Sequence, residues 1–481
     1  MQSTKFYIDG RWVDPQERRL LDVVDPSSEL PLAQISLGSA ADIDHAVSSA
    51  RRAFSQWSDV AVQDRIELLR RLVEIYSARI DEMASVISSE MGAPLTLART
   101  AQAASGLSHL RIFLGEFENF RFEDVLSSQA PDDRIIREPI GVCGLITPWN
   151  WPMNQVCLKA APAMTAGCTV VLKPSEIAPL SSMLFAEFID RAGYPAGVFN
   201  LVNGDGPTAG EALARHADVD MISFTGSSRA GAAVSRAAAD SFKRVALELG
   251  GKSPYIIFDD LDVAAAAARC ARSCFTNTGQ SCDAPTRMLV ERSAYEQAIE
   301  AARAVAAEMQ PDDPRKEGNH IGPLVSKAQF DKVQELIFAA LGEGARLVAG
   351  GPGRPADFDK GYFTRPTIFA DVENDMRIAR EEVFGPVLAI MPFDNEEEAI
   401  RLANDTVYGL SSYIQTGDSA RAQRVARKIR AGVVRLNGAS RGPGSPFGGY
   451  KHSGIGREGG RWGIEEYLEI KAVAGWSRSA A

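Results

Sequence analysis

The chain has 481 residues and a mass of 51.9 kDa, a length that suits about three domains. Hydrophobic residues make up 45% and charged residues 24%, values that exclude a mainly disordered chain. The formal net charge of −10 gives no electrostatic reason to bind nucleic acid or an anionic membrane. We therefore expect no nucleic-acid partner and no membrane partner.

The chain shows no export, membrane or metal signal. It lacks a run of about 18 apolar residues, and residues 1–16 lack the basic start and apolar run of a secretory signal. Six cysteines form neither a disulfide framework nor a paired CxxC pattern, and five scattered histidines form no HxxxH pair. These features predict a reduced, cytoplasmic protein without a metal site.

The first 139 residues combine helices with one polar excursion. Apolar residues recur at steps of three and four within residues 40–91, which predicts two long amphipathic helices. Gly92 and Pro94 together stop this run. Residues 120–139 then interrupt this rhythm with a polar segment bounded by proline. That segment does not fit either helix.

From residue 141 onward, short apolar runs alternate with helical stretches. This alternation predicts a doubly wound parallel sheet, with a second α/β region over about residues 252–435. The predicted strands are Val142–Ile146, Thr169–Leu172, Val198–Val202, Met221–Phe224, Arg244–Leu247, Tyr255–Phe258 and Arg287–Val290. The predicted helices are Met153–Ala166, Leu180–Ala192, Thr208–Arg215, Ser228–Ala238, Val263–Cys274 and Ala294–Met309.

Glycine or a hydrogen-bonding side chain follows every strand of the first sheet, at the edge where parallel sheets bind ligands. Gly204–Gly210 is a loosened glycine pattern beside a helix start, and either phosphate binding or ordinary turn chemistry would explain it. Lys173 needs a polar partner, which is a ribose hydroxyl, a phosphate or Glu176. Glu176 suits a ribose 2′-hydroxyl and would repel a 2′-phosphate, which favours NAD over NADP.

Cys282 is the candidate nucleophile. It lies in the polar stretch 277–287, whereas the other five cysteines sit among apolar or small residues and read as core thiols. No histidine lies near Cys282 in the sequence, so a Cys–His pair is not indicated. Glu248 is the only candidate base at a strand end.

Together these residues resemble the aldehyde dehydrogenase superfamily over nearly the whole chain. The matching motifs, in the family's order, are TPWNWP (147–152), LKPSE (172–176), FTGSS (224–228), ELGGKSP (248–254), GQSC (279–282), EEVFGPV (381–387) and PFGGYK (446–451). The resemblance implies an NAD-binding doubly wound domain over 1–119 and 140–251 and an α/β catalytic domain over 252–450. It further implies a β-arm over 120–139 and 460–481 that builds a homodimer or homotetramer.

The resemblance also implies roles for single residues. Cys282 would attack the aldehyde, and Asn150 with the Cys282 backbone N–H would bind the oxyanion. Glu248 would activate water to hydrolyse the thioester. Glu458 matches a glutamate linked to proton relay, with an exposed loop carboxylate as the alternative. The implied cofactor-binding residues are Trp149, Lys173, Ser175, Glu176, Gly206, Phe224, Gly226, Ser227, Leu249, Glu382 and Phe384.

The substrate tunnel departs from the family's usual pattern. Trp151 replaces the customary phenylalanine, and Leu158 stands where betaine-aldehyde enzymes tend to carry an aromatic, so a cation-binding cage is poorly supported. Arg441 would meet a substrate carboxylate or remain a solvated loop arginine. Asp283 beside the nucleophile would raise the pKa of the thiol. The remaining implied tunnel residues are Gln155, Ser281 and Phe447.

Three other functions compete with an NAD-dependent dehydrogenase that releases a free acid. A CoA-acylating relative would pass the thioester to CoA, but it has no need of Glu248 as a base. A hydrolase that uses Cys282 would leave the cofactor residues without a purpose. A binding or structural protein would not need Cys282, Glu248 and Asn150 together.

Overall fold

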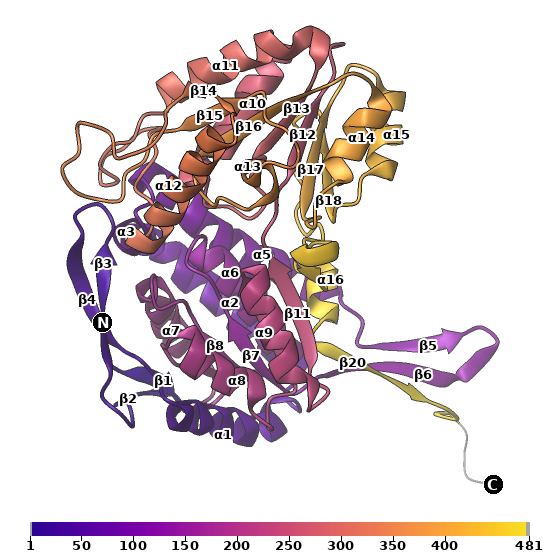
Figure 1. Ribbon diagram of the computed structural model, residues 1–481. Coiled ribbons are helices and arrows are strands. Elements are labelled where there is room, and N and C mark those ends of the chain that lie inside the picture. Colours follow the sequence, from indigo (N-terminus) through magenta and orange to yellow (C-terminus); the bar gives the residue numbers. More distant parts are fainter. Residues whose placement is uncertain (1, 478–481) are drawn as a thin grey trace.

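The computed structural model describes residues 2–477, and two large sheets organise it (Figure 1). The first sheet is parallel at its centre and antiparallel at both edges. At one edge β19 pairs with β11, and at the other β1 pairs with β9 and β2. Its strand order is β19 (Gly454–Ile455), β11 (Arg244–Leu249), β10 (Met221–Gly226), β7 (Val142–Ile146), β8 (Thr169–Lys173), β9 (Phe199–Leu201), β1 (Phe6–Ile8) and β2 (Arg11–Val13). Strands β7 and β8 are buried along their whole length, because helices cover both faces of the parallel centre.

The helices around this sheet confirm the predicted alternation, with two corrections. Residues 40–91 form three helices instead of two, because the backbone at Arg79 (φ −119°, ψ 25°) leaves the helical conformation. Residues 208–215 are not one α-helix, since a π-helical turn over Gly206–Gly210 precedes α8. The helices are α1 (Ala40–Trp57), α2 (Val62–Ala78), α3 (Ile80–Met91), α4 (Leu95–Leu97), α5 (Ala104–Asn119), α6 (Pro152–Ala166), α7 (Leu180–Ala192), α8 (Glu211–Arg215) and α9 (Ser228–Ala239).

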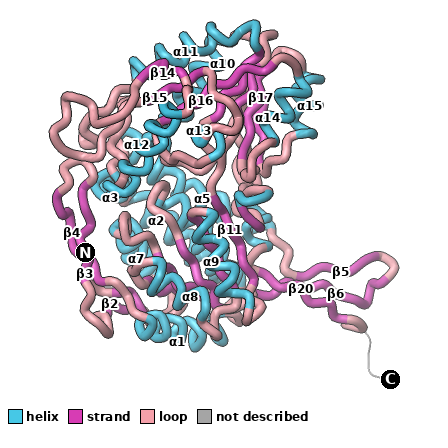
Figure 2. Tube along the Cα trace, viewed as in Figure 1, coloured by secondary structure: helices cyan, strands magenta, loops and turns pink. Residues whose placement is uncertain are grey.

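The second sheet is parallel except for its edge strand β14. Its order is β14 (Arg346–Ala349), β15 (Thr367–Ala370), β16 (Val387–Phe393), β13 (Arg287–Glu291), β12 (Pro254–Ile257), β17 (Ser411–Gln415) and β18 (Val433–Leu436). Its helices are α10 (Val263–Phe275), α11 (Tyr295–Glu308), α12 (Lys327–Gly342), α13 (Arg377–Arg380), α14 (Glu396–Asn404) and α15 (Ser419–Lys428). The chain crosses from the first sheet to the second over Gly250–Ser253, and the two α/β units face each other in Figure 2.

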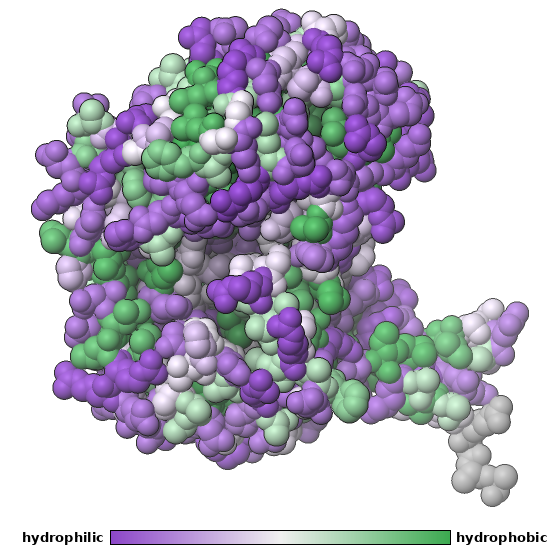
Figure 3. Space-filling view, viewed as in Figure 1, coloured by the Kyte–Doolittle hydropathy of each residue, from purple (hydrophilic) through white to green (hydrophobic). Residues whose placement is uncertain are grey.

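A three-stranded antiparallel sheet projects from the first unit (Figure 1). It consists of β5 (Glu123–Ser127), β6 (Ala130–Pro139) and β20 (Leu468–Val473), and we call it the arm. The excursion at 120–139 thus forms strands as the resemblance implied. Of the C-terminal piece, residues 460–465 are helix α16 (Gly460–Glu465), and residues 478–481 lie outside the described range. Hydrophobic residues gather on the arm in Figure 3.

One further hairpin, β3 (Leu20–Asp25) with β4 (Leu30–Ser36), lies beside the first unit. Within residues 2–477, no helix combines the length and the apolar character that a membrane span requires. The same residues hold no group of three or more His, Cys, Asp or Glu side chains that could bind a metal ion.

Candidate active site

The loop that carries the candidate nucleophile Cys282 follows α10 in an unusual backbone conformation. Asn277 and Thr278 have φ of 55° and 56°, and Gly279 has φ of 71°. Such non-glycine residues cost on the order of 1–3 kcal/mol each, so the surrounding structure must hold them. Gly279 is required for a second reason, because a Cβ there would lie 2.1 Å from the Gly385 carbonyl oxygen. This turn presents Cys282, half-buried, to the space between the two units.

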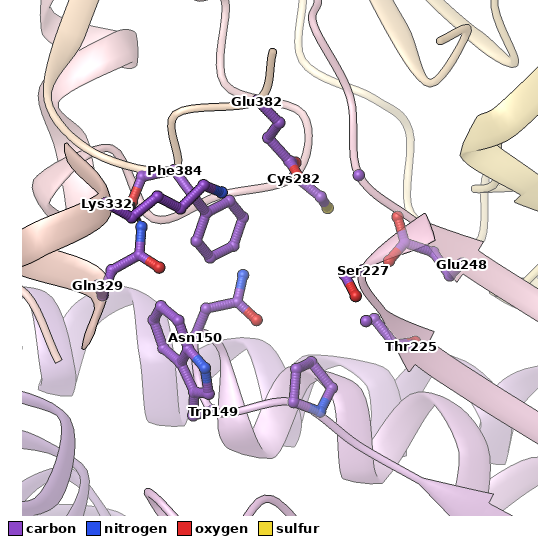
Figure 4. A pocket seen from close by; sticks show the side chains of 13 residues that line it. Trp149, Asn150, Thr225, Ser227, Glu248, Cys282, Gln329, Lys332, Glu382 and Phe384 are labelled. Atoms are coloured by element: carbon purple, nitrogen blue, oxygen red, sulfur yellow. Dashed lines mark hydrogen bonds between the residues drawn. The ribbon is translucent and has the colours of Figure 1, made fainter. Parts of the chain in front are cut away.

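A buried amide network fixes Asn150 beside this loop. The Asn150 side chain donates from Nδ2 to the Gln280 carbonyl oxygen at 3.0 Å. The backbone carbonyl oxygen of Asn150 accepts from Asn277 Nδ2 at 3.0 Å and from Gln102 Nε2 at 3.1 Å. Since an amide nitrogen carries two hydrogens, Asn150 keeps one N–H for a ligand. Figure 4 shows this amide directed into the same cavity as the Cys282 sulfur.

Two cavities meet at Cys282. The first, of about 200 Å³, is lined by Pro148, Trp149, Asn150, Thr225, Gly226, Ser227, Glu248, Gly250, Cys282, Gln329, Lys332, Glu382 and Phe384. The second, of about 170 Å³, is lined by Ser105, His109, Trp151, Asn154, Gln155, Leu158, Ser281, Cys282, Asp283, Arg441, Ser445, Phe447 and Gly459. Cys282 is the one residue common to both linings. A thiol between two cavities can react with a molecule in one while facing a second molecule in the other.

Glu248 lines the first cavity together with Cys282 (Figure 4). Both of its carboxylate oxygens are buried, and neither has a hydrogen-bond partner among the described residues. Burial, and next the charge of Glu458, hold the pKa of Glu248 well above its usual range. Burial and the Glu248 carboxylate likewise raise the pKa of the Cys282 thiol. The Cys282 thiol therefore favours its protonated form at neutral pH, and a proton acceptor must act before it can attack.

Glu458 is buried, so the alternative interpretation from the sequence, an exposed loop carboxylate, does not hold. It accepts a hydrogen bond from Lys159 Nζ, and the ammonium also donates to Thr225 Oγ1 at 2.7 Å. The Lys159 side chain is 0% exposed, in the middle of the buried helix α6. The charge of Lys159 also lowers the pKa of Glu248. The sequence analysis missed Lys159, although a lysine among the apolar residues of α6 was a signal for a buried partner.

Replacing Lys159 with methionine is expected to destabilise the fold. The substitution K159M would leave the Glu458 carboxylate buried without its cation, which costs about 3–5 kcal/mol. Urea unfolding should show this loss as a lower midpoint with an unchanged slope. The double substitution K159M/E458Q should recover most of it, because no charge is then left unpaired. Equal instability of the single and double variants would contradict this assignment.

The first cavity has the shape and polar groups of a nucleotide site. The rings of Trp149 and Phe384 meet edge to face with centroids 5.4 Å apart. Glu382 Oε1 accepts from the Gly251 backbone N–H at 3.0 Å, and a Cβ on Gly250 would lie 2.2 Å from the other carboxylate oxygen. Ser227 caps α9, where free backbone N–H groups favour phosphate. Lys332 of α12 adds a donor, and Gln329 of α12 donates to the Val383 and Phe384 carbonyl oxygens at 3.1 Å and 2.8 Å; the sequence analysis singled out neither residue.

The other implied cofactor residues lie outside this lining. Lys173 ends β8, and its Nζ donates to the Gly204 carbonyl oxygen at 2.6 Å and to Glu176 Oε2 at 3.3 Å. The ion pair between Lys173 and Glu176, one of the alternatives from the sequence, is therefore present. Burial lowers the pKa of Lys173. Ser175 lies beside them, and a Cβ on Gly206 would meet nothing within 4 Å. Ribose binding at this strand end stays a prediction.

Phe224 and Leu249 belong to the core of the first unit and are not among the residues that line the cavity. Both pack close to glycines, one at the end of β10 and one in α9: a Cβ on Gly226 would lie 2.5 Å from Phe224, and one on Gly231 would lie 2.7 Å from Leu249. Their side chains therefore support the strand ends. A backbone contact with the cofactor stays a prediction.

The second cavity contains every implied tunnel residue. Trp151, Leu158 and Phe447 supply apolar walls, and Gln155 contributes a buried side-chain oxygen that has no partner among the described residues. Trp151 Nε1 donates to Ser281 Oγ at 2.8 Å. The larger aromatic at position 151 thereby holds the residue before the nucleophile.

Asp283 is neutralised by a residue that the sequence analysis missed. Arg435 of β18 donates from NH2 to Asp283 Oδ2 at 2.8 Å, and its guanidinium lies 5.2 Å above the ring of Tyr413. The Tyr413 hydroxyl donates to the Asp283 carbonyl oxygen at 2.9 Å. Asp283 still raises the pKa of the Cys282 thiol, as the sequence predicted, but it is a weaker cause than burial and Glu248.

Comparisons with known proteins agree with this geometry. Residues 12–473 match the model of the aldehyde dehydrogenase family. The chain belongs to the aldehyde dehydrogenase family. A 3-succinoylsemialdehyde-pyridine dehydrogenase of a Pseudomonas species is 51% identical over 99% of both chains.

Solved structures of other aldehyde dehydrogenases extend the match to three dimensions. The enzyme of Bartonella henselae is 52% identical and superposes with a TM-score of 0.97, over 98% of this chain and 99% of that one. Aldehyde dehydrogenase C of Pseudomonas syringae, a mutant solved with NAD+ and octanal, is 49% identical with a TM-score of 0.97, over 100% of this chain and 98% of that one. Betaine aldehyde dehydrogenase of Staphylococcus aureus, solved with NAD+, is 34% identical with a TM-score of 0.95, over 99% of this chain and 96% of that one. The sequence-based prediction of family, fold and enzyme class is confirmed.

Proposed function

We propose that this aldehyde dehydrogenase oxidises an aldehyde to a free carboxylic acid with NAD+, and that Cys282 is its nucleophile. The position of Cys282 between two cavities carries the proposal, because it lets one thiol face the aldehyde and the cofactor from opposite sides. The cavity with Trp149, Phe384 and Glu382 fits the nicotinamide end of the dinucleotide. Two relatives solved with NAD+ support this choice of cofactor.

The residues divide the work in the following order. The Cys282 thiolate adds to the aldehyde carbon, and the Asn150 amide with the Cys282 backbone N–H holds the oxyanion, where losing one donor costs about 3–4 kcal/mol. When bound, NAD+ accepts the hydride that the thiohemiacetal carbon loses. Glu248 then takes a proton from water, which attacks the thioester and releases the acid. The Glu458 carboxylate, which Lys159 pairs and whose charge raises the pKa of Glu248, can accept the proton that Glu248 gives up.

Glu176 is proposed to select NAD+ over NADP+. Its carboxylate lies 3.3 Å from Lys173 Nζ, beside the strand end where the adenosine ribose would bind. A 2′-phosphate would meet this negative charge. The substitution E176S should raise the ratio of kcat/KM for NADP+ to that for NAD+ on the order of tenfold, which corresponds to about 1.4 kcal/mol. Initial rates at 340 nm would measure the ratio, with E211S on the exposed face of α8 as control. A ratio unchanged in E176S would place selectivity elsewhere.

We also propose the division of labour among the larger parts of the molecule. Residues 1–119 with 140–251 would bind the dinucleotide, residues 252–450 would carry the nucleophile, and the arm would join copies into a homodimer or homotetramer. Exposed apolar side chains on the arm support this role, since Val125, Leu126 and Ile470 are 49%, 51% and 72% exposed. Six free cysteines fit a reducing, cytoplasmic setting.

The first experiment is an initial-rate assay with NAD+ across aliphatic, aromatic and carboxylate-bearing aldehydes. NADH production without CoA would support the proposal. A requirement for CoA would instead favour the acylating alternative, in which Glu248 has no role as base. No NADH from any aldehyde, with or without CoA, would remove the proposal.

A further inference from the structure

The charges around the substrate cavity do not balance. Arg435 pairs with Asp283 at 2.8 Å, so these two charges offset each other. Arg441 lines the same cavity, yet between residues 2 and 477 it makes neither an ion pair nor a hydrogen bond. Its guanidinium lies 4.5 Å above the ring of Phe447, which fixes its position. Burial lowers the pKa of Arg441 and the charge of Asp283 opposes this effect, but Asp283 is itself paired with Arg435, so Arg441 is left without an ion-pair partner among the described residues.

Arg441 stands on the route between Cys282 and the surface. A further cavity of about 220 Å³ adjoins the substrate cavity, and the two share His109, Arg441, Ser445 and Gly459 in their linings. An aldehyde that reaches Cys282 through this passage leaves its far end beside Arg441. The residue thus meets the part of the substrate that does not react.

The neighbouring polar groups are suited to a hydrogen-bond acceptor. Burial lowers the pKa of His109, so its ring is neutral and donates from Nε2 to Asn154 Oδ1 at 2.8 Å. Since Asn154 Oδ1 is occupied, the amide N–H groups of Asn154 remain available, and the described residues offer them no acceptor. Gln155, 3% exposed, lines the same wall, and its buried side-chain oxygen is an acceptor without a partner among the described residues. Arg441 and the Asn154 amide therefore supply the hydrogen-bond donors in this wall, and the one carboxylate in the lining, Asp283, is already paired.

We propose that the physiological substrate is a short aldehyde with a carboxylate at its far end, and that Arg441 binds this carboxylate. The inference rests on the proposed function, because the aldehyde end must meet Cys282. A purely apolar tail would leave the guanidinium partly desolvated and unpaired, and a cationic tail would be repelled. The reaction would consume the aldehyde, NAD+ and water, and it would yield a dicarboxylate, NADH and two protons.

The test compares aldehydes of matched length in the full-length enzyme. Initial rates would be measured with 4-oxobutanoate and 5-oxopentanoate, and with butanal and pentanal as neutral counterparts. The enzymes would be wild type, R441Q and R441K, with R461Q as control, because Arg461 is exposed on α16 and pairs with Glu465. We expect wild type to prefer the acid-bearing aldehydes. R441Q should lose on the order of 10- to 100-fold in kcat/KM for these alone, mainly through KM.

Two further results complete the test. R441K should retain part of the preference, since it keeps the charge and loses the forked geometry. Turnover of neutral aldehydes without any preference for the acids, or an equal loss for both classes in R441Q, would overturn this inference and leave the proposed function intact. No NADH from any aldehyde would remove the proposed function and this inference with it.

Discussion

Replacing Cys282 with alanine is expected to abolish the oxidation of aldehydes. Without the thiol no covalent thiohemiacetal forms, and NADH production should fall by at least about 10³-fold. C282A should still bind NAD+, because the cavity that Trp149 and Phe384 line is otherwise unchanged. Quenching of tryptophan fluorescence would measure this binding. Such a result would separate the loss of chemistry from the loss of the cofactor.

Cys274 supplies the matched control for this experiment. It is a fully buried thiol on α10, eight residues before Cys282, and burial raises its pKa to about 12. C274A should keep most of the activity, since the removed sulfur lies in the core of the second unit. Activity retained in C282A, or lost equally in both variants, would contradict the assignment of the nucleophile.

Alkylation offers a second measurement on the wild-type enzyme. All six cysteines lie within the described residues, and Cys282 is the one whose side chain is not fully buried. Iodoacetamide should therefore label Cys282 first, as peptide mapping would show. Because its pKa is raised, the labelling rate should increase as the pH rises above neutral and the thiolate accumulates.

Much of the fold could be predicted from short-range patterns. Strand β7 and helix α7 have the bounds that the apolar runs indicated, because parallel strands are buried on both faces and read as continuous apolar segments. The break at Arg79 could not be predicted, since the apolar period continues from Tyr76 across it. The same holds for the π-helical turn at Gly206–Gly210, which leaves no periodic trace.

The candidate site was predicted where short motifs carry its chemistry. Cys282, Glu248 and Asn150 each stand in such a motif, and all three line one cavity. The partners that set their charges lie far away in the chain. Lys159 and Glu458 are 299 residues apart, and Asp283 and Arg435 are 152 apart. No local pattern joins residues at such separations, so the buried pair behind Glu248 and the neutralised Asp283 required the structure.

The substitution of Glu248 by glutamine is expected to uncouple the two halves of the reaction. Glutamine keeps the size of the side chain and cannot take a proton from water, so steady-state turnover should fall by about 10²–10⁴-fold. The thioester can still form once in each active site, and it then accumulates because its hydrolysis is slow. Rapid-mixing absorbance at 340 nm should therefore show a burst close to one NADH for each active site, followed by a slow phase. E211Q, on an exposed side chain that pairs with Arg215, should behave as wild type.

The pH dependence of the wild-type enzyme tests the same residue independently. Burial and Glu458 raise the pKa of Glu248, so its basic, ionised fraction grows as the pH rises through that raised value. Steady-state turnover of the wild type should increase with pH through this range, and the slow phase of E248Q should lack this dependence. A burst absent from E248Q would instead make Glu248 the base that ionises Cys282. Wild-type turnover in E248Q, with an unchanged pH profile, would exclude Glu248 from both steps.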